Sequence, residues 1–420
     1  MTRSDVKRTI DAIWRIESAR IVAGTAGIVR DVGVAEDIAQ EAFVAALEQW
    51  PESGVPDKPG AWLMSTAKHR AIDRVRRDTV HDRKTGELAR EMERRGEGER
   101  PDLEAAMDQP IEDDLLRLVF TTCHPVLSVE ARVALTLRLL GGLTTAEIAR
   151  AYLVAEPTIA QRIVRAKKTL AAAHVPFEVP ARDELPQRLG SVLEAIYLVF
   201  NEGYSPSAGE TWVRTELLEE ALRLGRILAA LMPQEPEVHG LLALMELQAS
   251  RARARVGPGG EPILLADQDR SRWDYMLVTR GLAALERATS LKAPLGPYTL
   301  QAAIAACHAR ARVAEDTDWR QIVALYDALA ELTGSPVVEL NRAVAVGMAF
   351  GPAAGLELVD RLASDRALRD YHRLPAVRAH LLAELGRTDE ARAEFELAAS
   401  LTDNAREREL LLRRAAPERG

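Results

Sequence analysis

Cysteine is scarce in this sequence, because Cys123 and Cys307 are the only two among 420 residues. Two cysteines exclude a disulfide framework and a zinc site built from four cysteines, and such scarcity is typical of a reducing compartment. Long apolar runs are also lacking, since no stretch approaches the roughly 20 apolar residues of a membrane span. The first residues do not contain the apolar core of a signal peptide. We therefore expect a soluble, cytoplasmic protein.

Aromatic residues make up only 5% of the chain, although 47% of its residues are hydrophobic. Ala, Leu, Arg and Glu dominate instead, and this composition favours helices. The sequence therefore predicts an all-α fold, and its length allows two or three domains.

An excess of basic charge is lacking as well, since the formal net charge is −8. DNA binding through overall charge is therefore not expected, because that affinity comes from Lys and Arg displacing counterions. The acidity is uneven, however. Residues 181–420 hold 29 Lys and Arg against 35 Asp and Glu, a net −6, whereas residues 1–180 carry −2. The basic residues of this N-terminal part gather in two segments.

One basic segment, TTAEIARAYLVAEPTIAQRIVRAKK at residues 144–168, predicts two helices joined by a tight turn. Thr144 or Thr145 is a suitable N-cap for the first helix, with Glu147 in its first turn, and Pro157 fits the start of the second. The second helix has an apolar face formed by Ile159, Ile163, Ala166 and Leu170. Its opposite side carries Thr158, Gln161, Arg162, Arg165 and Lys168. This pattern predicts a DNA-binding helix-turn-helix, although helix pairs with a solvated basic face are also common.

The other basic segment, KPGAWLMSTAKHRAIDRVRRD, predicts a helix with an apolar stripe formed by Leu63, Ala67, Ala71 and Val75. The other side of this helix carries His69, Arg70, Asp73, Arg76 and Arg77. Before it, AEDIAQEAFVAALEQW predicts an acidic helix whose apolar side is formed by Ile38, Ala42, Ala45 and Ala46. The Pro and Gly residues within 51–60 predict a loop between the two helices.

The order of these segments resembles the extracytoplasmic-function class of bacterial RNA polymerase sigma factors. The resemblance rests on AEDIAQEAFVAAL, WLMSTAKHRAIDRVRRD and LTLRLLGGLTTAEIARAYLVAEPTIAQRIVRAKKTL. It implies a promoter-melting sigma region 2 over residues 10–77 and a sigma region 4 helix-turn-helix over residues 113–175. Residues 78–112 have mixed charge with Gly and Pro, so we expect a flexible linker there.

The resemblance also implies partners and site residues. Core RNA polymerase would be bound through its β flap and its β′ clamp helices, and the clamp helices would contact Asp37, Gln40, Glu41 and Phe43. The promoter −10 element would be bound and opened by Lys58, Trp62, His69, Arg70, Arg76 and Arg77. The promoter −35 element would be read by Thr158, Gln161, Arg162, Arg165 and Lys168. Packing in the core is the alternative for Phe43 and Trp62, and a solvated position is the alternative for His69.

Residues 181–420 extend beyond the end of simple members of this class. VFNEGYSPSAGE and LMELQASRARARVGPGGEPILLADQDRSRWD resemble the subgroup with a long helical C-terminal extension. Near the C-terminus, the spacing of Gly386, Ala391, Phe395 and Ala398 matches that of conserved positions in a tetratricopeptide repeat. Gly351 and Thr317 lie at the position equivalent to Gly386 in two preceding units, close to the repeat length of about 34 residues. We expect a helical extension over 181–290 and tetratricopeptide-like repeats over 291–416 that bind a protein or peptide. A nonspecific helical bundle is the alternative.

Catalytic chemistry is not expected. A catalytic site would need residues at metal-ligand spacing or a nucleophile near a base. The polar and aromatic residues of the extension that could line a pocket provide neither; they are Glu202, His239, Asp267, Asp269 and Trp273. The Cys-His pairs at 123–124 and 307–308 also lack the spacing of zinc ligands. No cofactor or metal is therefore predicted. The segment DQDRSRWD is expected to pin one domain against another through buried ion pairs and an aromatic anchor.

The sequence thus predicts a sigma factor that directs promoter-specific transcription initiation and is not an enzyme. Residues 181–420 would regulate or brace it in cis, and the Pro-stiffened connection HVPFEVPARDELP favours bracing. Two alternatives stay open. One is a stand-alone helix-turn-helix regulator whose repeats bind an effector or partner, and the other is a helical enzyme with a DNA-binding appendage.

Overall fold

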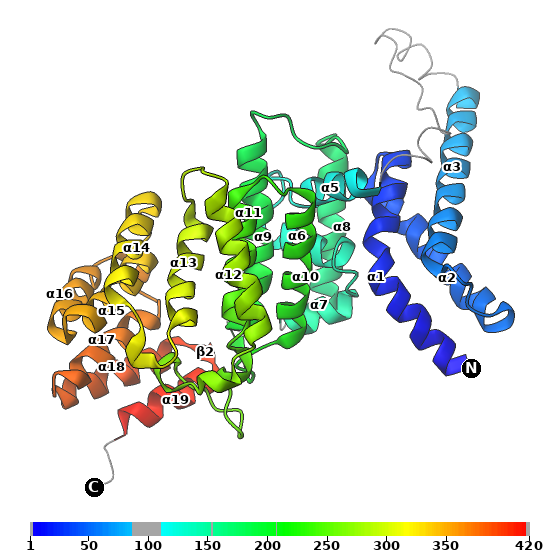
Figure 1. Cartoon of the computed structure of the whole chain (residues 1–420). Coiled ribbons are helices and arrows are strands. Elements are labelled where there is room, and N and C mark those ends of the chain that lie inside the picture. Colours follow the sequence, from blue (N-terminus) through cyan, green and yellow to red (C-terminus); the bar gives the residue numbers. More distant parts are fainter. Residues whose placement is uncertain (1–2, 86–110, 153, 207, 417–420) are drawn as a thin grey trace. The chain divides into compact units, whose positions relative to one another are not determined.

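Two units, residues 1–196 and residues 197–420, divide the chain in a computed structural model. The structure describes residues 3–85, 111–152, 154–206 and 208–416. Helices form nearly all of the regular structure in these ranges (Figure 1), so the predicted helical fold is confirmed. The strands in the described ranges are β1 (Ala208–Gly209) and β2 (Asp403–Asn404), which form a parallel pair.

Unit 1 begins with three long helices, α1 (Arg3–Val29), α2 (Val32–Ser53) and α3 (Pro59–Thr85). The predicted apolar sides of α2 and α3 are buried, as shown by Ile38, Ala42, Ala45, Ala46, Leu63, Ala67 and Ala71. Asp31 caps α2, because its Oδ1 accepts hydrogen bonds from the backbone N–H groups of Gly33 and Val34 at 2.7 and 2.9 Å. The expected linker starts inside α3, and its residues 86–110 lie outside the described residues.

The second half of unit 1 contains α5 (Ile111–Thr122), α6 (Val129–Leu139), α7 (Thr145–Ala151) and α8 (Glu156–Ala172). Thr144 caps α7 reciprocally with Glu147: the Thr144 N–H donates to Glu147 Oε2 at 2.8 Å, and the Glu147 N–H donates to Thr144 Oγ1 at 3.2 Å. Pro157 lies in the first turn of α8. The buried residues of α8 are Ile159, Ile163, Ala166 and Leu170, so the predicted apolar face is confirmed.

The next helix, α9 (Leu185–Tyr204), begins in unit 1 and contains the boundary between the units. Its first part packs on the helix-turn-helix half of unit 1. Arg188 Nη2 donates to the backbone oxygen of Phe120 at 3.1 Å, and Glu194 pairs with Arg132 at 3.0 Å. Residues 185–196 therefore belong structurally with the N-terminal unit, although they lie beyond the predicted sigma region 4.

Unit 2 continues with α10 (Thr215–Leu231) and α11 (Pro236–Ala249). Three short 3-10 helices follow, η3 (Ala252–Arg255), η4 (Leu265–Asp267) and η5 (Arg270–Arg272), and then α12 (Tyr275–Ser290) and α13 (Pro297–Arg310). Helix α11 is buried along almost its whole length because α10, α12 and α13 pack around it. It forms the centre of this part of unit 2.

The remainder of unit 2 is a series of helix hairpins. It consists of η6 (Ala314–Asp316), α14 (Trp319–Thr333), α15 (Pro336–Phe350), α16 (Pro352–Leu362), η7 (Arg366–Leu368), α17 (Arg373–Glu384), α18 (Thr388–Leu401) and α19 (Ala405–Ala415). Gly351 and Gly386, at φ 100° and 74°, form the turns of two successive hairpins, and glycine adopts such angles without a steric penalty. One shared core contains Ala379, Leu382, Ala391, Phe395 and Ala398. The tetratricopeptide assignment itself stays a prediction.

Candidate nucleic-acid and polymerase interfaces

The exposed side of α8 borders a surface hollow of about 410 Å³. Four of the five predicted −35 residues line it, namely Thr158, Gln161, Arg162 and Arg165, together with Ser128 and Ala131 at the start of α6. Lys168 is exposed outside the hollow. Among the described residues no carboxylate forms an ion pair with Arg162 or Arg165. This face thus offers free cationic and amide donors next to one another, as phosphate and base-edge contacts require.

The predicted −10 residues, which lie on α3 and at Lys58 just before it, do not share one environment. Lys58, His69, Arg76 and Arg77 are exposed. Trp62 is half-buried, and its ring packs edge-on against the fully buried Trp50 with 5.3 Å between centroids. Arg70 pairs with Glu41 of α2 at 3.0 Å. The exposed basic residues are therefore available to DNA in this structure, whereas Trp62 is partly engaged in the core.

The acidic side of α2 forms a second, open hollow of about 500 Å³. Asp37, Gln40 and Glu41 line it, and so does Val44, whose exposure of 48% is high for an apolar residue. Phe43 points elsewhere, because its ring packs against Trp14 with 4.8 Å between centroids. The structure thus brings three of the four predicted docking residues together and places Phe43 in a packing contact.

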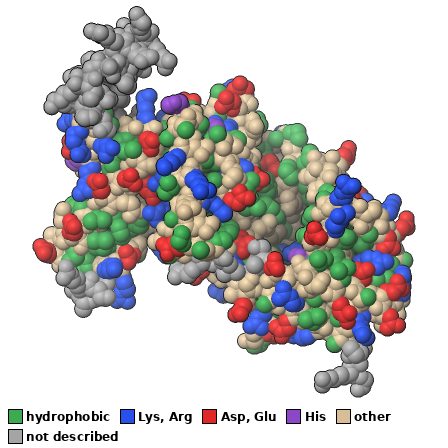
Figure 2. Space-filling view, turned by 180° about the vertical axis from the view of Figure 1, so that it is seen from behind, with side chains coloured by type: hydrophobic (Ala, Val, Ile, Leu, Met, Phe, Trp, Pro, Cys, Tyr) green, Lys and Arg blue, Asp and Glu red, His purple; other side chains and the backbone are tan. Residues whose placement is uncertain are grey.

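Charge is mixed over the wider surface. On the face shown in Figure 2, Lys and Arg side chains are interspersed with Asp and Glu side chains and with apolar patches. Binding at the two hollows on α2 and α8 would therefore depend on the side chains that line them and not on a broad electrostatic potential of one sign.

A buried carboxylate that sequence reasoning missed ties α2 to the helix-turn-helix half. Glu36 is 5% exposed, and it accepts a hydrogen bond from Arg138 Nε of α6 at 2.6 Å. It also forms an ion pair with Lys167 of α8. These residues lie far apart in the chain and no local pattern connects them, so no sequence signal identified the cluster.

Replacing Glu36 by Gln is expected to lower the free energy of unfolding by about 1–3 kcal/mol, because two partly buried cations lose their common carboxylate. Urea unfolding of the full-length protein measures the change. Glu52→Gln, at an exposed position of the same helix, is the matched control. Equal midpoints for both variants would show that the cluster contributes no net stability.

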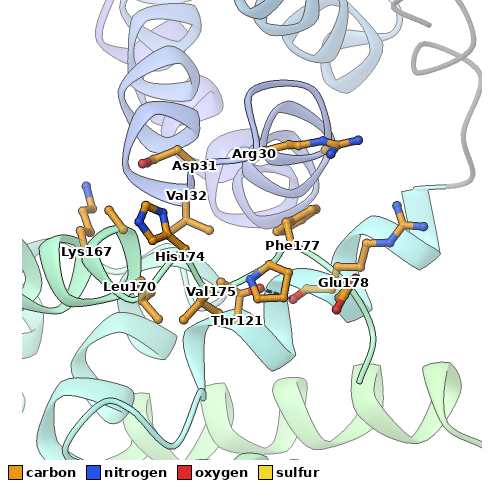
Figure 3. A pocket seen from close by; sticks show the side chains of 14 residues that line it. Arg30, Asp31, Val32, Thr121, Lys167, Leu170, His174, Val175, Phe177 and Glu178 are labelled. Carbon is orange, nitrogen blue, oxygen red and sulfur yellow. Dashed lines mark hydrogen bonds between the residues drawn. The ribbon is translucent and has the colours of Figure 1, made fainter. Parts of the chain in front are cut away.

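A cavity of about 560 Å³ lies where the turn between α1 and α2 meets α5 and the end of α8 (Figure 3). Arg30 and His174 line it, and both have left-handed backbone angles, at φ 56° and 48°. Lys167 and Arg117 also line it, but Lys167 pairs with Glu36 and Arg117 pairs with its helix neighbour Asp114 at 2.8 Å. The cavity is thus a junction of helix ends with paired cations, and we assign no ligand to it.

The residues of the extension that were weighed as a possible catalytic site have separate partners or are exposed. Glu202 pairs with Arg214 at 2.7 Å, and the His239 ring bonds the backbone oxygen of Pro233 at 3.1 Å. Asp267 and Asp269 are exposed, so the expectation of buried ion pairs in DQDRSRWD is wrong. Its aromatic residue Trp273 is buried, at 5% exposure. Asp269 instead caps the start of η5 at the surface, where its Oδ1 accepts a hydrogen bond from the Ser271 N–H at 2.9 Å.

The two cysteines are both buried and occupy separate sites. Burial raises the pKa of the Cys123 thiol, which lies 3.2 Å from Thr136 Oγ1, and burial also raises the pKa of Cys307. Within the described ranges, no group of three or more His, Cys, Asp or Glu side chains has the geometry of a metal site. No helix in the same ranges has both the length and the apolar character needed to span a membrane.

Two family models match the parts of unit 1 that form these surfaces. Sigma-70 region 2 matches residues 19–80, and Sigma-70, region 4 matches residues 117–170. The ECF RNA polymerase sigma factor SigC of Mycobacterium tuberculosis is 28% identical over 176 residues, which cover 41% of this chain and 83% of that protein. The probable RNA polymerase sigma-C factor of Mycobacterium bovis has the same identity and coverage. The chain thus carries the sigma-70 regions 2 and 4 of a sigma factor and is distantly similar to an extracytoplasmic-function sigma factor.

This sigma factor also has a relative that includes the extension. An uncharacterized protein of Rhizobium meliloti (strain 1021) is 45% identical over 379 residues, which cover 90% of this chain and 88% of the relative. Residues 188–289 match a family of unknown function, DUF6596. Sigma regions 2 and 4 direct transcription initiation by binding core RNA polymerase and promoter DNA, and they catalyse no reaction. The predicted family and its non-enzymatic role are therefore confirmed.

Proposed function

We propose that this sigma factor reads the promoter −35 element with α8, opens the −10 element with α3 and docks on the β′ clamp helices through the acidic hollow of α2. The observation that carries the proposal is the exposed side of α8, where Arg162 and Arg165 face a hollow and form no ion pair among the described residues. The buried apolar face of the same helix fixes its orientation. Such a helix presents its polar side to the major groove.

The acidic hollow of α2 supports the docking role through its charge. Asp37, Glu41 and Glu48 are exposed, and the apolar side chain of Val44 lines the same surface between Glu41 and Glu48. An exposed apolar residue flanked by acidic groups is suited to a basic partner that also buries apolar surface. The −10 role of α3 is supported by the exposed cations Lys58, Arg76 and Arg77.

For the extension we propose a role in cis as a brace that maintains unit 1 in the arrangement needed for initiation. The contacts of α9 support this role, because Arg188 and Glu194 attach the start of the extension to α5 and α6. The repeat-like hairpins of α15 to α18 are proposed to provide a surface for a protein or peptide partner.

Replacing Arg162 or Arg165 by Ala is expected to weaken promoter recognition by about 1–3 kcal/mol, because each loses one contact to a base or phosphate. The melting temperature is expected to stay nearly unchanged, since neither side chain has an ion-pair partner to lose in the described chain. Runoff transcription with purified core RNA polymerase on genomic promoter fragments measures the effect. Arg361→Ala in α16, 65% exposed at its side chain, is the control. Full activity of both α8 variants would remove α8 from the reading role.

A further inference from the structure

Four arginines gather in unit 2, where the nearby carboxylates Glu407, Glu315 and Asp316 do not contact them directly. Arg251 follows α11, Arg255 ends η3, Arg270 begins η5 and Arg373 begins α17. Among the described residues none of the four has a carboxylate within ion-pair distance. Arg255 is only 8% exposed, and burial lowers its pKa. A nearly buried guanidinium without a counter-ion in direct contact is costly, so the cluster requires a physical explanation.

Aromatic rings stabilise these guanidinium groups only in part. The Arg255 guanidinium carbon lies 3.7 Å from the centroid of the Tyr204 ring and 5.2 Å from that of Trp212. Arg251 and Arg270 lie over Trp273, with 5.8 and 5.0 Å between guanidinium carbon and ring centroid. Such contacts fix the positions of the cations. They do not neutralise the charge, and so the cations remain able to attract an anion.

Several N–H donors in the cluster lack an acceptor. The buried Nε of Arg251 and the indole nitrogens of Trp212 and Trp273 have no hydrogen-bond partner within the described ranges. Trp273 is 5% exposed, so solvent does not readily replace the missing acceptor. Buried polar groups are ordinarily satisfied. Three unsatisfied donors beside three or more cations therefore indicate a site for a group rich in acceptor oxygens.

The histidine beside the cluster adds no positive charge. His308 lies next to Arg270, whose Nη1 donates to the His308 backbone oxygen at 2.6 Å. Burial, reinforced by Arg251 and Arg270, lowers the pKa of the His308 imidazole to about 3. His308 is therefore neutral at physiological pH, and the positive charge of the cluster comes from arginine alone.

We propose that Arg251, Arg255 and Arg270, with the indole donors of Trp212 and Trp273, form a binding site for a small phosphate-bearing metabolite. Guanidinium groups bind phosphate oxygens through paired N–H donors, and the fork of arginine suits this geometry better than a lysine does. A small anion is favoured over a nucleic-acid backbone because Arg255 is 8% exposed and a duplex cannot approach it. The site lies in unit 2 and does not depend on the proposed roles of α2, α3 and α8.

The proposal is tested with the full-length protein by isothermal titration calorimetry and thermal unfolding. The probes are inorganic phosphate, pyrophosphate and ATP, with sodium chloride at matched ionic strength as the reference. Binding of at least one phosphate probe, with a rise in melting temperature that chloride does not give, is the expected result. If ATP binds much more tightly than pyrophosphate, the nucleoside part contributes to recognition.

Arg251→Gln is the informative variant, because it removes one cation while Arg255 and Arg270 keep their backbone hydrogen bonds. It is expected to weaken phosphate binding by at least about tenfold, as for one lost charge-assisted contact. Without phosphate it is expected to raise the melting temperature, because repulsion among the arginines decreases. A purely structural role for Arg251 predicts a lower melting temperature instead. Arg253→Gln, an exposed neighbour in η3, is the matched control and is expected to behave as wild type.

Three results would overturn the proposal. One is the absence of binding or thermal stabilisation by all three phosphate probes. A second is equal binding of phosphate by the Arg251→Gln variant and the wild type. The third is stabilisation by duplex DNA that depends on Arg251 while the small phosphates have no effect, which would assign the cluster to a nucleic-acid backbone.

Discussion

Reversing Asp37 and Glu41 together to Lys is expected to abolish association of the full-length sigma factor with core RNA polymerase. Both carboxylates are exposed on α2 and line the same hollow as Val44. Opposite charges at these positions would repel a basic partner surface, and like-charge contacts across an interface cost several kcal/mol. Co-purification with core RNA polymerase, without promoter DNA, measures the effect. Glu52→Lys near the end of the same helix is the control for added charge.

The ion pair between Glu41 and Arg70 allows a second test, which distinguishes a direct role of Glu41 in polymerase binding from a role through Arg70. The pair is exposed, with side chains 61% and 38% accessible, so its own contribution to stability is about 0–1 kcal/mol. Exchanging the two residues, as Glu41→Arg with Arg70→Glu, restores the pair but leaves the charge at position 41 reversed. If Glu41 contacts the polymerase, the exchanged protein stays defective. Normal binding by the exchanged protein would show that Glu41 acts only through Arg70.

The elements that sequence reasoning predicted well are governed by local periodicity. The buried face of α8 follows from apolar residues recurring along one helix, and the cap of α7 follows from Thr144 and Glu147 three positions apart. Both features involve neighbours in the chain. These two features therefore depend little on how distant segments of the chain pack together.

The features that sequence reasoning missed are set by contacts between distant segments. Glu36 meets Arg138 and Lys167 only after α2, α6 and α8 have packed together. The arginine cluster of unit 2 likewise joins segments from α9 to α17. The segment DQDRSRWD, which contributes Arg270 to it, was interpreted as a source of buried ion pairs. Asp267 and Asp269 proved to be exposed, and Asp269 caps a 3-10 helix at the surface, which avoids the cost of desolvating its carboxylate.

Removing the extension is expected to impair initiation, and the structure shows where the chain has to be cut. A chain that ends after Pro180 lacks the whole of α9 and loses the contacts of Arg188 and Glu194 with unit 1. A defect in this chain therefore does not distinguish a brace from a damaged unit 1, and a second truncation is needed.

A chain that ends after Tyr204 keeps all of α9 and removes the rest of unit 2. If the part of the extension beyond α9 is needed for the brace, this chain is expected to bind core RNA polymerase but to give several-fold less runoff transcript than the full-length protein, because the contacts of Arg188 and Glu194 alone do not maintain its promoter-reading helices. Circular dichroism and thermal unfolding establish that unit 1 of the truncated chain is folded. If the extension occludes the promoter-reading helices, the same chain gives more transcript than the full-length protein. Equal transcription by the two chains, with and without cell extract, would exclude both roles for the part of the extension beyond α9 and leave the hairpins of α15 to α18 as a surface for another partner.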